Sequence, residues 1–502
     1  MSLSTAYNII SSAFVSTAAQ TSVISTNISN VNTPGYSRQI ANTSTNSYGG
    51  SDVSSVTRVA NGALLEQVNA STSQAAAQQA LANGLTTLAQ TVSDSTSSTT
   101  TSGANQNGDS PSAMLTNLQS ALVTYESSPS SQAAGQAVVT AASELATSLN
   151  TGSTTVQTVR EQADAGMSSA VSTVNSLLNQ FAQADASVVT GLATGANVNG
   201  SEDKRDSILT QLSNQLGIST TTNPNGSISI YTDSGVNLYQ SNVVSQLSFT
   251  ASPTLTAGQG GNPVTVNGVA ITGPSAPMAT QSGALAGLST LRDTVAPQYQ
   301  SQLDQIASGV INAFAETDQS TTNTGLAAQP GLFTYTGATG VPTAATATGL
   351  ASVIEVNPAV DPSQGGDVSL LQNGGINGAN YVYNSTNAAG YSGRIQGMAT
   401  GMSASQTFDA AAGLGATGTL SDYANASVSW LQGQNQQASN AVDYQNSLVT
   451  QATAALSNAT GVSLDTEMTN MLNIESTYTT TAKLLTTVDD MFNALLAATN
   501  RG

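Results

Sequence analysis

The sequence predicts an α+β multidomain protein in which long terminal helices form a coiled-coil-like pair and a helical stalk carries β-rich outer insertions. All 13 prolines lie between Pro34 and Pro362. Both ends are therefore free to form long helices, because proline disrupts a helix interior. Both ends also carry apolar residues at helical spacing. Within residues 218–280 apolar and polar side chains alternate, which is typical of strands.

The first helix is expected to end at Thr33-Pro34-Gly35. The residue before a proline disfavours the helical conformation, and glycine permits a left-handed turn. A seven-residue repeat interrupted by Thr17 and Thr21 precedes this turn, which indicates a coiled-coil-like seam. Its two positions hold Leu3, Ile10, Ile24 and Val31, and Tyr7, Phe14 and Ile28.

The C-terminal segment has a similar pattern, interrupted by Thr481. Its apolar positions are Met471, Ile474, Tyr478, Leu485, Val488, Phe492 and Leu495. The threonines of residues 477–481 disfavour an isolated helix, because β-branching restricts their side chains. We therefore expect the two terminal helices to pair. An intramolecular helical hairpin is one reading, and a pair that also packs against neighbouring subunits is the other.

The middle of the chain predicts a series of helices. They are expected over residues 63–92, 113–125, 132–149, 154–192, 201–217 and 283–317, and again from Met398 with breaks near 413–418 and 461. Ser201 is the expected N-cap of its helix, and residues 93–112 are expected to form a loop.

Two turn signals lie between the helices. Asn225-Gly226 and Asn267-Gly268 are each followed by an alternating or apolar segment, which predicts two β-hairpins. Residues 322–395 are rich in Gly, Asn and Pro. The expected division is a terminal-helix domain (1–40 with 462–502), a stalk (41–217 with 282–320 and 396–461) and a β-rich outer insertion (218–281 with 321–395).

Composition excludes several classes of function. The chain has no Cys and no His, and nine basic residues oppose 28 acidic ones. Disulfide scaffolds, zinc sites and histidine-based triads are excluded. Nucleic acid is not an expected partner of so acidic a chain, and no apolar run is long enough to span a membrane. No charge precedes Arg38, so we expect either a cytoplasmic chain or export without a cleaved signal.

Catalytic signatures are weak, and we expect no enzyme, no cofactor and no metal. Ser201 and Lys204 match the SxxK motif, in which a lysine could activate the serine. That class of enzyme also needs the motifs SDN and KTG, and neither is present. Asp203, Asp206, Asp293 and Asp304 could supply a carboxylate pair for sugar hydrolysis, yet ion pairs Arg205–Asp206 and Arg292–Asp293 are favoured. Gly365-Gly366-Asp367 is similar to a calcium-binding repeat but does not recur, and Trp430 is expected in the core.

One segment is more specific. Asn27-Ile28-Ser29-Asn30-Val31-Asn32-Thr33-Pro34-Gly35-Tyr36-Ser37-Arg38-Gln39 resembles the N-terminal signature of flagellar axial proteins. Its Gly-Tyr-Ser-Arg-Gln ending resembles the family of flagellar hook-associated protein 1, the first hook–filament junction protein. Residues 461–472, 204–218 and 282–304 also resemble segments of that family. The threonines of 477–481 depart from the family's Gln- and Ala-rich pattern.

This resemblance implies a structural, extracellular subunit of the flagellum. It implies type III export in unfolded form without a cleaved signal, a chaperone on the C-terminal helix, and a ring between the hook protein and the second junction protein. The apolar residues of the two terminal helices would form the assembly interface, and the turn out of the first helix would be fixed by Asn27, Asn30, Thr33, Pro34, Gly35 and Tyr36.

Two alternatives remain. Another axial subunit, such as a rod, hook or flagellin-like protein, would share the terminal helices. A secreted enzyme or adhesin on a flagellar scaffold would need a catalytic group or a binding cleft in residues 218–280 or 322–395.

Overall fold

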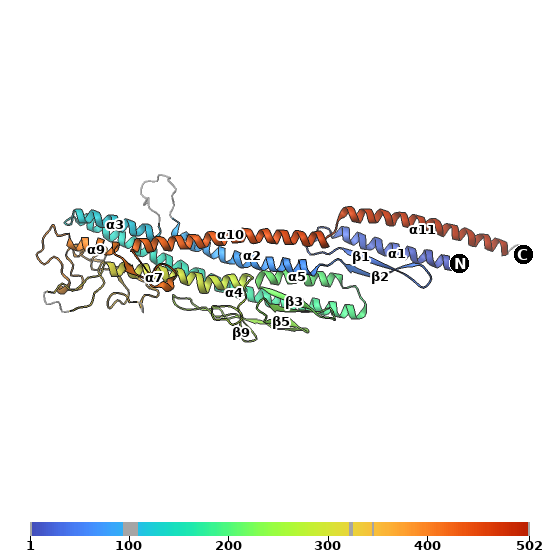
Figure 1. Ribbon diagram of the computed structural model, residues 1–502, viewed down its shortest axis with the longest axis horizontal. Coiled ribbons are helices and arrows are strands. Elements are labelled where there is room, and N and C mark those ends of the chain that lie inside the picture. The colour runs from blue at the N-terminus through green and yellow to red at the C-terminus, as the bar shows by residue number, and fades with distance from the viewer. Residues whose placement is uncertain (1–2, 94–108, 321–324, 344–345, 500–502) are drawn as a thin grey trace.

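The computed structural model describes residues 3–93, 109–320, 325–343 and 346–499. These residues form an elongated molecule (Figure 1). Helices α1 (Leu3–Ser29) and α11 (Leu464–Thr499) lie side by side at one end, near both chain termini. The expected long terminal helices are confirmed. The expected loop 93–112 lies mostly outside the described residues.

A β-hairpin packs against α1, where no strand was expected. Strands β1 (Gln39–Thr45) and β2 (Ser51–Arg58) pair antiparallel from Gln39↔Arg58 to Thr45↔Ser51, with an irregularity between Asn42 and Thr43. Helix α1, this hairpin and helix α11 are called the terminal unit below. The sequence did not predict this hairpin, because its strands consist mostly of Ser, Thr and Asn. They contain too few apolar residues to show the alternating pattern of a strand.

Long helices build the stalk. Helix α2 (Gly62–Ala89) and helix α10 (Leu420–Thr460) run along each other. Helix α4 (Gln132–Thr194) packs on α3 (Pro111–Ser127), α5 (Asn199–Gln215) and α7 (Ala296–Ala313). Side chains of Asn61, Ser110, Ser131 and Thr419 accept hydrogen bonds at the N-termini of four of these helices. The remaining stalk elements are η1 (Gln90–Val92), which extends α2, and helices α6 (Ala284–Thr290) and α9 (Gly393–Ser403).

Helix α4 corrects the expectation of two helices over 132–149 and 154–192. It is one helix of 63 residues. The Thr151-Gly152-Ser153 segment stays helical because tertiary contacts use it. A side chain at Gly152 would lie 3.0 Å from Leu303, and the Ser153 hydroxyl donates to Gln300 Oε1 at 2.9 Å. Packing here outweighs the low helix propensity of glycine.

Two other helix boundaries also differ from expectation. Helix α5 begins at Asn199, with Val198 at the cap, so the predicted cap Ser201 lies inside the first turn. The Asn199 side chain donates to the Val56 carbonyl at 3.1 Å, which draws the start of α5 toward β2. The expected helix 283–317 is α6, a π-helical turn η2 (Leu291–Val295) and α7, which ends at Ala313.

The β-rich unit confirms both predicted hairpins. Asn225-Gly226 turns between β3 and β4, and Asn267-Gly268 turns between β8 and β9 with positive φ at both residues. One antiparallel sheet has the order β3 (Ile218–Thr222), β4 (Ile228–Thr232), β5 (Asn237–Gln240) and β6 (Val243–Val244), and another has β7 (Leu247–Ser248), β8 (Thr265–Val266) and β9 (Val269–Ala270).

Residues 314–392 and 404–419 are mostly irregular and cover the far end of the stalk. A β-rich insertion was expected over 321–395, but in the described part of that range only β10 (Phe333–Tyr335) and β11 (Ile354–Val356) form a pair of strands. The short elements of this region are two strand pairs and one short helix. These are β10 with β11, β12 (Gln406–Thr407) with β13 (Thr417–Gly418), and α8 (Leu370–Asn373), with one-turn helices η4 (Leu350–Ser352), η5 (Pro362–Gln364), η6 (Ala379–Tyr381) and η7 (Ala410–Ala412).

Two apolar clusters lie in series along the molecule. One joins α2, α3, the first half of α4, α7, α9 and α10, and Trp430 packs against it as expected. The other joins the second half of α4 to α5 and the β-rich unit. Neither cluster includes a described residue of the terminal unit.

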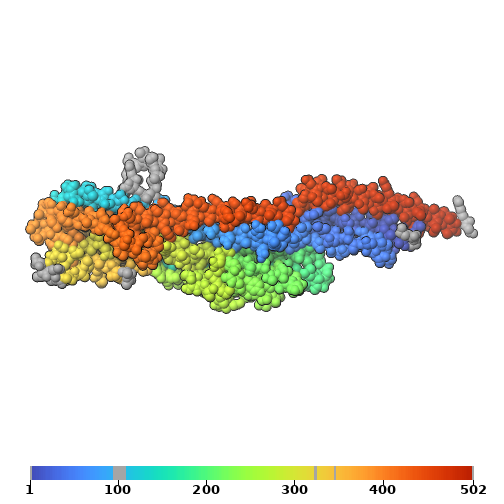
Figure 2. Space-filling model, viewed as in Figure 1, coloured from blue at the N-terminus to red at the C-terminus, as the bar shows by residue number. Residues whose placement is uncertain are grey.

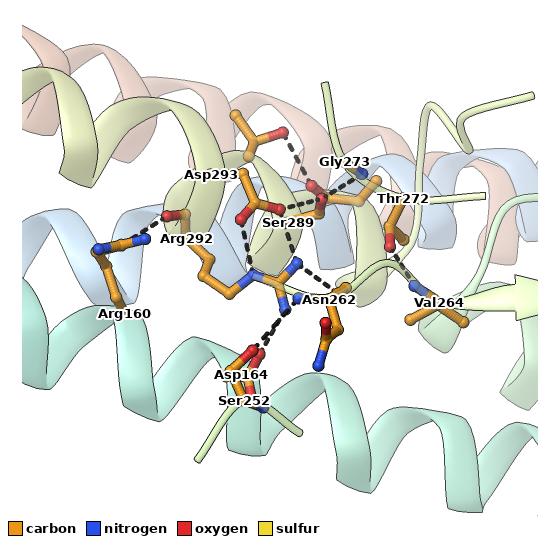
Figure 3. Close-up of polar contacts among 12 residues, drawn as sticks. Arg160, Asp164, Ser252, Asn262, Val264, Thr272, Gly273, Ser289, Arg292 and Asp293 are labelled. Atoms are coloured by element: carbon orange, nitrogen blue, oxygen red, sulfur yellow. Dashed lines mark hydrogen bonds and ion pairs between the residues drawn. The ribbon is translucent and has the colours of Figure 1, made fainter. Parts of the chain in front are cut away.

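A buried polar network holds the irregular segment before β8 against α4 (Figure 3). Arg292, on the π-helical turn, pairs with Asp164 and Asp293 and donates to the Asn262 carbonyl. Arg160 donates to the carbonyls of Thr256, Gln259 and Arg292. The Arg292–Asp293 pair was expected from the sequence. Arg292 is paired with two carboxylates, and Arg160 is held by three carbonyl oxygens. The network thus fixes the orientation of the β-rich unit.

Candidate assembly interface and elbow

The two terminal helices pack antiparallel. Helix α1 starts, and α11 ends, at the same end of the molecule (Figure 1). Phe14 meets Tyr478 edge-on, with ring centroids 5.1 Å apart and planes at 71°. Ile10, Ile24 and Val488 are buried in the seam. Such a seam is the geometry that the heptad patterns predict.

The apolar residues of the predicted interface fall into three groups by exposure. Besides the buried Ile10, Ile24 and Val488, the half-buried ones are Leu3, Phe14, Ile28, Val31, Met471, Ile474 and Leu485, and the exposed ones are Tyr7, Tyr478, Phe492 and Leu495. Helix α11 extends beyond the start of α1, which leaves its last turns without a partner helix in this chain (Figure 1).

Further apolar side chains point away from the seam, and the heptad analysis did not select them. Val15 is 65% exposed, Met468 60% and Leu472 64%. Leu484, Met491 and Leu496 are also more than half exposed. In the space-filling view the terminal unit projects beyond the stalk, so α11 is open along its length (Figure 2). Large exposed apolar side chains concentrated on one helix are typical of an interaction site.

An elbow links the end of α1 to the hairpin, and Asn27 is its centre. The buried Asn27 amide donates to the Gln39 carbonyl at 2.9 Å, and its Oδ1 accepts from the Gln39 N–H at 2.9 Å and from the Tyr36 hydroxyl at 2.7 Å. All three bonds join α1 to residues 9 to 12 positions later. The side chain therefore fixes the direction in which the chain leaves the helix.

The rest of the predicted turn lies on the surface of the elbow. Asn30 donates to the Thr26 carbonyl at 2.9 Å, and the Thr33 hydroxyl donates to Asn30 Oδ1 at 3.1 Å. Gly35 has φ of +77°, where a side chain would be strained. Thr33, Pro34 and Gly35 are exposed. The structure thus brings together all six residues that the signature selected for the turn.

Two arginines in this region were missed by sequence reasoning. Arg38 pairs with the buried Glu467 of α11 at 2.6 Å, and its N–H donates to the Thr460 carbonyl at 2.8 Å. Burial, with the charges of Asp203 and Glu467, raises the pKa of Tyr36 to about 12. Tyr36 therefore stays protonated and can donate to Asn27. The sequence feature that could have singled out these arginines is the rarity of basic residues, because the chain has only nine.

Arg58, at the end of β2, contacts three carboxylates of α5. Its guanidinium lies 2.8 Å from Glu202, 3.0 Å from Asp203 and 2.6 Å from Asp206. Arg205, which was expected to pair with Asp206, instead pairs with Asp185 at 2.9 Å, because it faces α4 and the turn after β3. Burial raises the pKa of Asp206, with Arg58 opposing that shift.

The weaker catalytic candidates have structural partners. Asp203 and Asp206 bind Arg58, Asp293 binds Arg292, and Asp304 accepts backbone N–H groups of Gly349 and Ala351. Across the described ranges, no group of three or more Asp or Glu side chains is arranged to hold a metal ion. Among the helices that the structure describes, none is long and apolar enough to cross a membrane.

Comparison with known proteins gives two family matches. Residues 104–332 match the helical domain of the flagellar hook-associated protein FlgK, and residues 455–498 match the C-terminal segment of flagellar basal body rod FlgEFG proteins. No curated protein matches the chain. The solved structure of the flagellar hook junction protein FlgK from Burkholderia pseudomallei aligns at 21% identity and a TM-score of 0.41, over 54% of this chain and 46% of that one. The alignment thus spans less than half of that protein's length.

The two family matches together cover more than half of the chain and come from flagellar proteins alone. They define the class as flagellar axial proteins. Within that class, residues 104–332 are similar to the helical domain of the hook-associated protein FlgK. The resemblance seen in the sequence is confirmed, and the family is a structural one.

Proposed function

We propose that this chain is a structural subunit of the bacterial flagellum that forms the junction ring between hook and filament. One observation supports this role above the others. The paired terminal helices carry an apolar surface that the chain does not cover, including Val15, Met468 and Leu472. Burial of such a surface against copies of the chain would provide the main favourable free energy of assembly, at about 25 cal/mol per Å² before association costs.

The proposed assembly has three parts. The terminal unit forms the inner layer, the stalk lies outside it, and the β-rich unit with the irregular segment faces outward. We place the hairpin Gln39–Arg58 with the terminal helices, because it packs on α1. The ring would contact the hook protein on one side and the second junction protein on the other.

Export is proposed to follow the family's route. The chain would pass the type III apparatus unfolded, without a cleaved signal, and a chaperone would hold the C-terminal helix beforehand. A chain without Cys forms no disulfide that would obstruct such passage. The role proposed here is structural and extracellular, and it requires no cofactor, catalytic group, nucleic acid or membrane.

A rod or hook subunit is the second candidate. The match of residues 455–498 to the C-terminal segment of basal body rod FlgEFG proteins favours it. The match of residues 104–332 to the FlgK helical domain favours the junction role instead.

Deletion of the gene in its source bacterium tests the proposal. Electron microscopy of the hooks and an assay of flagellin in the medium are the measurements. We expect complete hooks without filaments, and flagellin released into the medium. Absent hooks would establish a rod or hook subunit, and normal filaments would contradict any axial role.

Complementation sharpens this test. A chain with Met468→Gln and Leu472→Gln should fail to restore filaments, because both exposed apolar side chains leave the proposed interface. A matched chain with Thr469→Gln and Glu475→Gln changes exposed polar positions of the same helix and should restore them. Equal restoration by both chains would show that this face of α11 is not an interface.

A further inference from the structure

The joint between the terminal unit and the stalk is crossed by two short connections. Residues 59–61 lead from β2 to α2, and residues 461–463 lead from α10 to α11. Gly461 has no room for a side chain, because a Cβ would lie 2.5 Å from the Ser457 carbonyl oxygen. The joint is therefore crossed by only two short segments, and glycine is required at the start of one of them.

Contacts across the joint are polar. The two apolar clusters hold no described residue of the terminal unit, so no continuous core joins it to the stalk. What crosses instead are hydrogen bonds, such as Asn199 to the Val56 carbonyl at 3.1 Å and the Arg38 N–H to the Thr460 carbonyl at 2.8 Å. Such bonds depend on distance and angle, and a small rotation breaks them.

Arg58 makes the strongest of these contacts. Its side chain is only 10% exposed and reaches three carboxylates of α5, at 2.6 to 3.0 Å. The Ser37 N–H adds a longer bond to Asp203 at 3.3 Å. One positive charge thus holds three negative charges that would otherwise repel one another. Without Arg58 these carboxylates would face the terminal unit uncompensated.

A groove of about 1110 Å³ lies beside this contact. Its walls come from both sides of the joint, with the elbow 30–37 and Arg58 on one side and Leu65, Asn69, Gln211 and Leu456 on the other. Space between two bodies that are held by polar contacts allows one body to move relative to the other.

We propose that the joint is a hinge and that Arg58 with Glu202, Asp203 and Asp206 is its latch. With the latch closed, the terminal unit is seated on the end of the stalk. When the latch opens, the unit rotates about residues 59–61 and 461–463, and the groove changes width. The latch belongs to the single chain, so it can be tested apart from the junction role, and either proposal can fail without the other.

Distance measurements on the full chain test the latch. The chain has no Cys, so cysteines introduced in pairs carry spin labels without competition. One pair, Gln451 of α10 with Thr469 of α11, spans the joint, and a second pair, Asn83 of α2 with Gln451, lies within the stalk. All three positions are exposed. Double electron–electron resonance gives the distance distribution of each pair.

We expect a single narrow distribution for both pairs in the otherwise native chain. In Arg58→Gln the pair across the joint should gain a second population or broaden at least twofold, while the stalk pair stays unchanged. Lys204→Gln is the matched control, since it removes a positive charge from exposed Lys204 on the same helix α5 and should change neither pair.

A second variant approaches the latch from the other side. The triple change Glu202→Gln, Asp203→Asn and Asp206→Asn leaves Arg58 in place and should broaden the same pair. The latch is overturned if both latch variants keep the narrow native distribution, if the native distribution is already broad, or if the stalk pair broadens with the joint pair. The last result would assign Arg58 to the folding of the stalk.

Discussion

At the scale of residues, scarce charges are placed where they hold parts of the fold together. Each described arginine binds a carboxylate or a backbone carbonyl. Arg38 and Arg58 lie at the joint, Arg160 and Arg292 at the β-rich unit, and Arg394 binds the carbonyls of Phe314 and Ala315. Among the described basic residues only Lys204 and Lys483 are exposed, and charged residues make up just 7% of the chain. This distribution fits a subunit whose faces are covered by other copies, because soluble monomers usually keep more surface charge.

One buried carboxyl makes stability depend on pH. Asp304 is buried, and burial raises its pKa from 3.8 to about 6, against hydrogen bonds from Ala351, Gly349 and Gln300. Because the folded pKa exceeds the unfolded value, this group's contribution to stability is fully present below about pH 4 and is lost as pH rises through about 6. The change is on the order of 3 kcal/mol.

Urea unfolding of the native chain and of Asp304→Asn, at several pH values from about 2 to 7, measures this effect. The native chain should gain stability relative to the variant as pH falls. Asp361 is a control for which the pH dependence of stability should be opposite, because a hydrogen bond from the Ser363 N–H lowers the pKa of its carboxyl. Relative to Asp361→Asn the native chain should lose stability as pH falls. A flat difference for Asp304 would contradict the raised pKa.

At the scale of elements, close backbone approach decides where helices cross. Gly287 of α6 lies against α2, and a Cβ there would be 2.2 Å from the Ala77 carbonyl oxygen. Gly433, within α10, has open space around the corresponding position. Two glycines in helices of one chain therefore have opposite roles, one required by packing and one merely tolerated.

Alanine substitutions at these two positions should have opposite effects. Gly287→Ala forces α6 away from α2 and should lower the unfolding free energy by about 1–3 kcal/mol. Gly433→Ala removes unfolded-state freedom and should raise it by about 0.5–1 kcal/mol. Thermal or urea unfolding of both variants checks the pair. Equal effects of the two variants would show that α2 and α6 do not approach as closely as described.

At the scale of the whole molecule, stability is unevenly distributed. The stalk and the β-rich unit share two extended apolar clusters, whereas the terminal unit relies on one helix seam and on polar contacts at the joint. Local unfolding begins where buried apolar contacts are few. The terminal unit is thus the part that opens most easily in the single chain.

Limited proteolysis of the monomer should reveal this order. We expect a broad-specificity protease to remove roughly the first 40 and last 40 residues before it cuts within the stalk helices α2, α4 and α10. Mass spectrometry of the fragments over time is the measurement. Early cleavage inside α4, or ends that persist as long as the stalk, would contradict the prediction.

Local sequence alone determined the terminal helices, their apolar seam, the elbow signature and the two hairpins with Asn-Gly turns. These features depend on neighbouring residues, through heptad spacing, proline and glycine conformation, and side-chain bonds within a few positions. Only the tertiary structure decided that α4 runs on through Gly152, that Arg205 binds Asp185, and that Arg58 binds α5. In each case the residues that meet are separated by 20 to about 150 positions in the sequence. Which distant groups meet depends on how whole helices pack, and no local pattern encodes it.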